Sequence, residues 1–193
     1  HEVGDVREWE RMGYRVRTYR MIKARELWNL INICATYAAE PGIFFIDNAN
    51  EMTNAKAYGQ KVVATNPCGE QPLAPYSVCN LAAVNLAKFA NKETKTVDFE
   101  ALRETVKVGV RMQDNVIDAT PYFLEANKKQ ALGERRVGLG VMGLADLLIY
   151  CEKEYGSEEG NKLVDEVFQT IAVAAYEESI ELGKERGSFP FLQ

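Results

Sequence analysis

The chain has 193 residues, of which 47% are hydrophobic and 26% charged, a balance typical of one soluble globular domain with a substantial core. Its formal net charge of -5 and the lack of a long Lys/Arg cluster argue against direct contact with nucleic acid. The apolar runs are too short or too interrupted to cross a membrane, so we expect a cytoplasmic location and no membrane partner. Because the sequence opens on His1 rather than Met, we expect it to be a piece of a longer protein.

The first clear element is an amphipathic helix that begins near Lys23 and ends before Pro41-Gly42. Its apolar residues recur at helical spacing: Leu27, Leu30, Ile31, Cys34 and Tyr37. We therefore predict that Cys34 is a buried structural thiol.

Two candidate strands follow this helix. Residues 42–47 (GIFFID) form a short apolar run rich in strand-forming residues, which predicts a buried strand. Residues 61–66 (KVVATN) are the second candidate. Helix and strands in this order indicate an α/β layer arrangement. Residues 66–76 contain three prolines and a glycine, so we expect a loop with a largely fixed backbone, and apolar order resumes over 78–89.

The second half of the chain is predicted to be mainly helical. Asp98 is a candidate N-cap for a helix that ends before Pro121 and carries one apolar face: Phe99, Leu102, Val106, Val110 and Ile117. Further helices are predicted near 122–132, over 140–152, and over 157–186, where Gly187 ends the last one. Cys151, at the end of the helix over 140–152, is expected to be a core thiol.

Cys68 differs from these thiols because it lies in a loop stiffened by prolines, with Asn66 and Glu70 each two positions away. In an extended backbone, side chains at alternate positions project to the same side, so an amide, a thiol and a carboxylate would converge. Such a group can hydrogen-bond a substrate's hydroxyls, accept a proton and act as a nucleophile or redox centre. Gly69 would let a ligand approach the backbone closely. The alternative is a proline-rich turn in which Asn66 and Glu70 only satisfy the loop's own amides.

Cys79 lies eleven positions after Cys68 in the same loop-bounded segment, residues 64–80. Alone it would be interpreted as a core thiol, but its proximity to Cys68 makes a redox role worth testing. The spacing resembles neither a redox C-x-x-C nor a pair of metal ligands. The sequence offers no close pair of cysteines, and its single histidine is His1, so we expect neither a metal site nor a Cys-His nucleophile pair.

Several stretches resemble the catalytic subunit of ribonucleotide reductases. The family's site motif, Asn-x-Cys-x-Glu, is present as NPCGE, residues 66–70. The stretch NPCGEQPL followed by YSVCNLAAVNL is similar to sequences of the adenosylcobalamin-dependent (class II) branch. The stretches EPGIFFIDNANE and ERRVGLGVMGLADLL also resemble that branch. The resemblance implies a helix-rich α/β fragment of the family's ten-stranded barrel. Residues 1–193 would form a single partial domain with the site loop at 64–80.

The resemblance also implies a role for each site residue. Cys68 would carry the thiyl radical that abstracts the ribose 3′-hydrogen, Glu70 would take the 3′-hydroxyl proton, and Asn66 would hydrogen-bond the ribose hydroxyls. Pro67 and Gly69 would complete the substrate-binding segment. Cys79 would supply one reducing equivalent and form a redox-active disulfide with a second cysteine.

The implied cofactor is adenosylcobalamin and the implied substrate a ribonucleotide. Implied partners are dNTP and ATP effectors bound through segments outside this piece, a thioredoxin-type reductant, and a second copy of the full-length protein in a homodimer. The family's second redox cysteine lies far upstream of the radical cysteine, and Cys34 is a poor substitute for it. We therefore expect the fragment to be inactive alone.

Two other interpretations remain open. In the first, the chain belongs to an oxygen-dependent (class I) large subunit, whose radical comes from a partner metalloprotein. In the second, it is a non-catalytic helical scaffold whose loop cysteines are structural.

Overall fold

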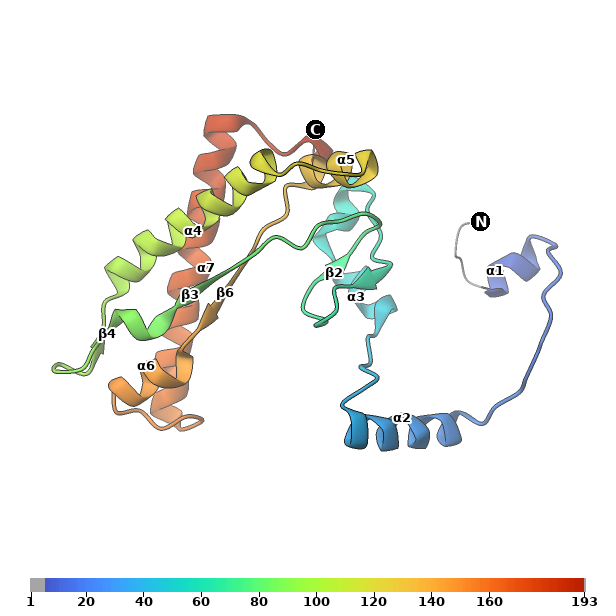
Figure 1. Ribbon diagram of the computed structural model, residues 1–193, viewed down its shortest axis with the longest axis horizontal. Helices are drawn as coiled ribbons and strands as arrows, with labels where there is room; N and C mark the ends of the chain where they lie inside the picture. Colours follow the sequence, from blue (N-terminus) through green and yellow to red (C-terminus); the bar gives the residue numbers. More distant parts are fainter. Residues whose placement is uncertain (1–5, 193) are drawn as a thin grey trace. The chain divides into compact units, whose positions relative to one another are not determined.

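The computed structural model describes residues 6–192, which separate into one unit ending at Phe44 and another beginning at Phe45 (Figure 1). Within these described residues, no helix combines the length and the apolar character needed to cross a membrane.

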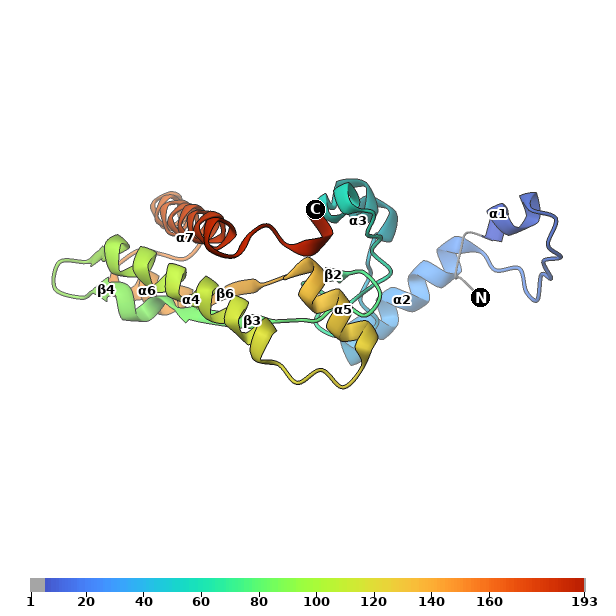
Figure 2. The same ribbon diagram turned by 90° about the horizontal axis from the view of Figure 1, so that it is seen from above.

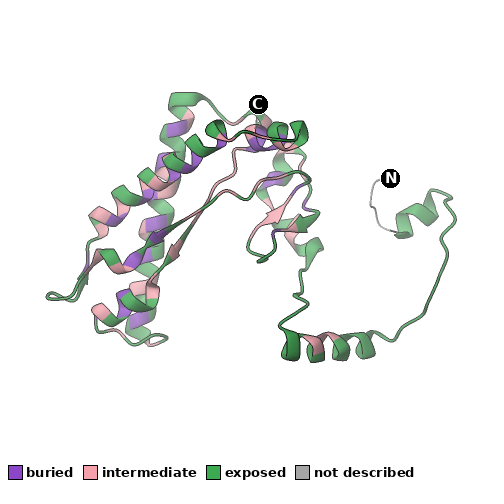
Figure 3. Ribbon diagram, viewed as in Figure 1, coloured by how far each residue is buried: buried purple, intermediate pink, exposed green. Residues whose placement is uncertain are grey.

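In the first unit, the described residues form two helices, α1 (Val6–Arg11) and α2 (Ala24–Ala38). The predicted helix after Lys23 is confirmed. It ends at Ala38, and the next residue, Ala39, has a left-handed backbone and donates the last N–H bond, to the carbonyl of Ala35. No residue of α2 is buried (Figure 3), and Cys34 is only half-buried. The prediction that Cys34 is a core thiol is therefore wrong, because an apolar helix face is buried only where another element packs on it.

The predicted buried strand over 42–47 is also wrong. Residues 43–45 are irregular and exposed, with Phe45 68% exposed, and Ile46 begins helix α3 (Ile46–Met52). A short 3₁₀ helix, η1 (Asn54–Tyr58), follows. A strand needs a partner for its backbone groups, and this run has none in the described residues. The candidate strand over 61–66 shortens to β1 (Ala64–Thr65), which pairs antiparallel with β2 (Pro72–Leu73) within the predicted loop.

The centre of the second unit is a parallel pair of strands, β3 (Leu81–Asn85) and β6 (Gly138–Met142). Leu81 lies opposite Gly138, and Asn85 lies opposite Met142. Helix α4 (Phe99–Ala119) contacts both strands and packs against α7 (Glu158–Arg186), as the views in Figures 1 and 2 show. Helix α6 (Leu144–Tyr150) follows β6 directly, and η2 (Leu86–Phe89) leads from β3 to a small hairpin of β4 (Ala90–Asn91) and β5 (Thr96–Val97).

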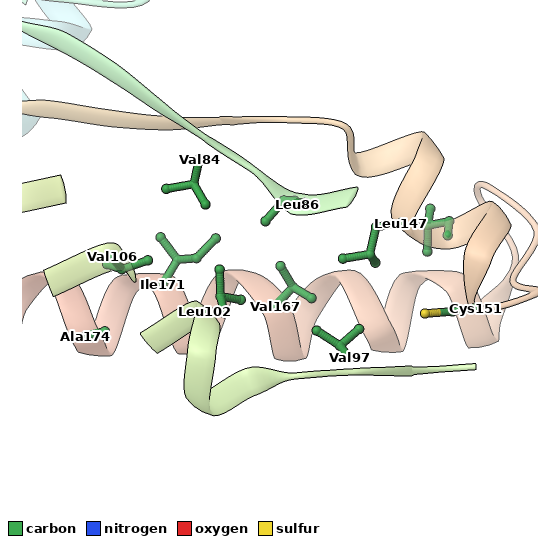
Figure 4. Close-up of a cluster of buried hydrophobic side chains, with 11 residues drawn as sticks. Val84, Leu86, Val97, Leu102, Val106, Leu147, Cys151, Val167, Ile171 and Ala174 are labelled. Carbon is green, nitrogen blue, oxygen red and sulfur yellow. The ribbon is translucent and has the colours of Figure 1, made fainter. Parts of the chain in front are cut away.

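The side chains between these elements form one apolar core (Figure 4). Its members come from β3, η2, β5, α4, α6 and α7 and the residues beside them: Val84, Leu86, Val97, Leu102, Val106, Leu147, Leu148, Cys151, Val167, Ile171 and Ala174. Cys151 is 2% exposed, which confirms its predicted place in the core. Burial raises the pKa of the Cys151 thiol, which keeps it protonated and unreactive.

Local signals placed the two long helices correctly. The Asp98 carboxylate accepts a hydrogen bond from the Ala101 N–H at 2.9 Å at the start of α4, and the Ser157 hydroxyl accepts one from the Gly160 N–H at 3.0 Å at the start of α7. The predicted helix near 122–132 appears as α5 (Glu125–Glu134). The predicted helix over 140–152 is partly wrong, because its first residues belong to β6 and α6 begins only after Gly143.

Ion pairs tie α4 to α7 on the outside of this core. Arg111 of α4 donates to Glu178 at 2.7 Å and to Glu185 at 2.7 and 2.8 Å.

A second set of ion pairs joins α4 to the end of α5. Arg135, which follows α5, donates to Asp114 at 2.8 Å and to Asp118 at 2.8 and 2.9 Å. These bridges fix the C-terminal part of α4.

The last described residues pack back on α5 and η1. The ring of Phe189 meets the ring of Tyr58 edge-on, with centroids 5.3 Å apart. Phe191, in the 3₁₀ helix η3 (Pro190–Leu192), lies directly over Gly133, where a Cβ atom would overlap its ring.

Candidate active site

The candidate site is a tight turn at the end of the β1–β2 hairpin. The Gly69 N–H donates to the carbonyl of Asn66 at 3.0 Å, which closes a four-residue turn through Pro67 and Cys68. Gly69 has φ 85°, a conformation that favours glycine. The expected loop is present, but its backbone is not extended, because the turn reverses the chain between Asn66 and Glu70.

The turn nevertheless brings the predicted amide and carboxylate together. Asn66 is 8% exposed, and its side-chain amide donates a hydrogen bond to the Glu70 carboxylate. Its amide oxygen accepts a hydrogen bond from the Gln71 N–H at 3.0 Å. Asn66 thus satisfies a loop amide, as the alternative interpretation requires, and also orients an acidic side chain, as a substrate site requires.

Cys68 lies at the exposed tip of this turn. Pro67, Gly69 and Glu70 are exposed as well, so the thiol and the carboxylate are both open to a ligand. The fixed φ of Pro67 and the hydrogen bonds of Asn66 restrict the backbone on either side of the thiol. The arrangement can therefore present a sulfur atom and a proton acceptor to one substrate from a constrained backbone.

Cys79 lies just before β3 and lines a cavity of about 320 Å³. The cavity is bounded by the segment at the start of β3, by the end of α4 and the residues after it, and by the end of α5 and the residues after it: Val78, Asn80, Leu81, Val116, Ile117, Thr120, Tyr122, Ala131, Glu134 and Arg136. Cys68 is not part of its wall. All four cysteines are free, so the disulfide expected of Cys79 stays a prediction.

Sequence reasoning missed a buried amide next to Cys79. Gln113 of α4 is 1% exposed and hydrogen-bonds the backbone of Asn80 and Gly138. A signal for it was present, because Gln113 falls three positions after Val110 and four before Ile117 on the apolar face of the helix. A polar residue in that stripe indicates a specific partner.

Among residues 6–192, no three His, Cys, Asp or Glu side chains gather closely enough to hold a metal ion.

The family model for the ribonucleotide reductase barrel domain matches residues 6–192. The chain belongs to the ribonucleotide reductase family. The match includes residues of both structural units and confirms the resemblance to ribonucleotide reductases that the sequence motifs indicated. It identifies the chain as barrel-domain sequence with a helix-rich α/β structure.

Curated relatives support the same assignment. The chain is 43% identical over 171 residues to a vitamin B12-dependent ribonucleoside-diphosphate reductase of Thermoplasma acidophilum, covering 89% of this chain and 22% of that protein. A Mycobacterium tuberculosis protein of the same name is 40% identical over 167 residues, or 86% of this chain and 23% of the relative. A ribonucleoside-diphosphate reductase large chain of Cryptosporidium parvum is 36% identical over 186 residues, or 94% of this chain and 23% of the relative. The chain thus spans less than a quarter of the length of these reductases.

Proposed function

We propose that this chain forms the site-bearing part of an adenosylcobalamin-dependent (class II) ribonucleotide reductase, which reduces ribonucleotides to deoxyribonucleotides for DNA synthesis. The observation that carries the proposal is the turn at residues 66–70, where a buried amide orients a carboxylate beside an exposed thiol. The similarity to reductases named vitamin B12-dependent favours this branch over the oxygen-dependent one.

Each group of the turn has a role in this reaction. A thiyl radical on Cys68 takes the hydrogen atom from the ribose 3′-carbon, and Glu70 accepts the proton of the 3′-hydroxyl. Asn66 fixes Glu70 and offers its amide to the ribose hydroxyls, while Pro67 and Gly69 shape the backbone against which the substrate lies. Cys79 and a second cysteine supply two electrons and two protons, the 2′-hydroxyl leaves as water, and the two sulfurs form a disulfide.

Among the described residues, Cys68 fits the role of the residue on which adenosylcobalamin acts. Cys68 is exposed at a constrained turn, so a bulky group can reach its sulfur. We propose that other parts of the protein hold the corrin. When bound, the cofactor supplies the radical that removes the hydrogen atom from the Cys68 thiol.

We further propose that residues 1–193 are one partial domain of a ten-stranded barrel, with the site loop at 64–80. The parallel pair of β3 and β6 supports this, because parallel strands are stable mainly inside larger sheets covered by helices. Neighbouring strands from the rest of the protein would extend the pair. They would also cover the exposed turn and exclude water from a radical intermediate.

The proposed substrate is a ribonucleoside diphosphate, after the names of the relatives, although a triphosphate reductase would use the same turn. The proposed partners are dNTP and ATP effectors, a thioredoxin-type reductant and a second copy in a homodimer, and the proposed location is cytoplasmic.

The decisive experiment replaces the thiol in the full-length protein. We expect Cys68→Ala to abolish deoxyribonucleotide formation, and we expect Cys34→Ala, which removes a half-buried thiol of α2, to leave it within about twofold of wild type. Reduction by Cys68→Ala would support the scaffold interpretation. Wild-type turnover that needs a second subunit instead of added adenosylcobalamin would support the oxygen-dependent class.

A further inference from the structure

A single buried amide on α4 holds the backbone next to Cys79. Both hydrogens of Gln113 Nε2 are used, because it donates to the carbonyl of Asn80 and to the carbonyl of Gly138, each at 2.9 Å. The side-chain amide of Asn80 donates a hydrogen bond to the backbone carbonyl of Gln113, also at 2.9 Å. Helix α4 is thereby locked to the residue that follows Cys79.

The backbone carbonyl of Asn80 is also held by a residue of β6. The Gly138 N–H donates to the Asn80 carbonyl at 2.9 Å, so this oxygen accepts one bond from the strand and one from Gln113. The backbone on the carboxyl side of Cys79 is therefore fixed by two elements.

Gly138 connects this arrangement to the turn that carries Cys68. A Cβ atom at Gly138 would overlap the side-chain amide of Gln71 and the Leu81 side chain, so Gln71 lies directly against the glycine. The N–H of Gln71 donates to Asn66, whose amide binds Glu70. A continuous series of contacts thus runs from the turn through Gln71, Gly138 and Gln113 to the Cys79 segment.

This arrangement is not optimal for stability. The side-chain oxygens of Gln113 and Gln71 are buried without a hydrogen-bond partner among the described residues. A buried polar atom without a partner costs on the order of 1–3 kcal/mol, and an apolar side chain at position 113 would avoid that cost. A role in positioning the backbone explains why an amide lies in the apolar stripe of α4.

We infer that Gln113 is a positioning residue for Cys79, and that through Gly138 and Gln71 it sets the place of this thiol relative to the Cys68 turn. The inference rests on the proposed function, in which both thiols act on one ribose. Gln113 touches neither the thiol nor the substrate. It acts through the Asn80 and Gly138 carbonyls.

The test compares two variants of α4 in the full-length protein. Gln113→Met keeps the length of the side chain and removes both donated bonds, whereas Val110→Ala weakens the same helix and leaves these bonds intact. The first measurement is the equilibrium constant between the Cys79 disulfide and dithiothreitol. The second is the rate of Cys79 alkylation by iodoacetamide, followed by peptide mass spectrometry, which does not depend on catalysis.

We expect Gln113→Met to change the equilibrium constant of the Cys79 disulfide and the alkylation rate of Cys79 at least fivefold each. We also expect it to lower kcat about tenfold at unchanged KM for the nucleotide. Val110→Ala should leave all of them within twofold of wild type. Equal behaviour of the two variants would overturn the positioning role. A changed alkylation rate in a protein whose Cys68→Ala variant still reduces nucleotides would refute only the proposed function.

A second variant covers the case in which Gln113→Met does not fold. Gly138→Ala displaces Gln71 from the other end of the same series of contacts, and we expect it to change the alkylation rate of Cys79 in the same direction. An unchanged rate in a folded Gly138→Ala protein would contradict the inference.

Discussion

The side-chain amide of Asn66 donates a hydrogen bond to the carboxylate of Glu70 across the four-residue turn that carries Cys68. The turn thus combines a structural bond, from the Gln71 N–H to Asn66, with an orienting bond to an acid. These two functions of one side chain can be separated by mutation.

Asn66→Asp keeps the acceptor for the Gln71 N–H and replaces the donor to Glu70 by a like charge. We expect the two carboxylates to repel each other and kcat for ribonucleotide reduction to fall at least tenfold. Initial rates of the full-length protein measure this effect. Asn161→Asp, an exposed change in the first turn of α7, is the matched control and should retain the wild-type rate. A wild-type rate for Asn66→Asp would show that the bond to Glu70 has no catalytic role.

The apolar core between α4, α7 and the strands should be sensitive to truncation. Leu102 is fully buried in this core, and replacing it by alanine leaves a cavity. We expect Leu102→Ala to lower the free energy of unfolding by roughly 2–5 kcal/mol in chemical denaturation. Val108→Ala lies on the same helix at a side chain that is 67% exposed and should cost less than about 0.5 kcal/mol. Similar losses for the two variants would place the core elsewhere.

The N-cap of α7 gives a separate test of local stability. Ser157→Ala removes the oxygen that accepts from the Gly160 N–H, and we expect a loss of about 1 kcal/mol. Hydrogen exchange of the Gly160 amide should become faster, whereas Ser157→Asp, which keeps an acceptor, should retain most of the protection. Unchanged exchange in Ser157→Ala would mean that the cap is dispensable.

The ion pairs near the end of α4 predict a pH dependence of stability. The hydrogen bond from Arg135 holds the pKa of Asp118 below its ordinary value of 3.8. Because the pKa is lower in the folded than in the unfolded state, the stabilisation is complete above the ordinary value and is lost as pH falls through the folded one. The carboxylate is partly exposed, so the effect should be modest and weakened by salt.

Denaturation of wild type and Asp118→Asn at a series of pH values tests this. The stability difference should be largest above about pH 5 and should shrink as the pH falls below the ordinary carboxyl pKa. Asp165→Asn, at an exposed position of α7, should show no such trend. A constant difference between wild type and Asp118→Asn would contradict the assigned role of Arg135.

The sequence was most informative where a structural signal is local. Asp98 and Ser157 start α4 and α7 because a cap needs only a side-chain oxygen and an N–H three residues later. Gly187 ends α7 for a similarly local reason. Such signals do not depend on the rest of the fold, so they could be recognised without it.

Features that need a distant partner could not be predicted in the same way. The run before Ile46 is apolar, but a strand forms only where another strand pairs with it. Strand β6 overlaps the start of the run 140–152, which was predicted to be helical. This strand depends on pairing with β3, which is far away in the sequence. In the site, the spacing of Asn66 and Glu70 predicted their convergence. The turn that produces it depends on the backbone of Gly69, which alternation of side chains does not describe.

The contact between Gly133 and Phe191 has a consequence for how this family can vary. A side chain on position 133 and the aromatic ring on position 191 compete for the same space, so neither position is free to change alone. In an alignment of homologous reductases, we expect the two columns to covary. A residue larger than glycine in the first column should appear together with a smaller residue in the second.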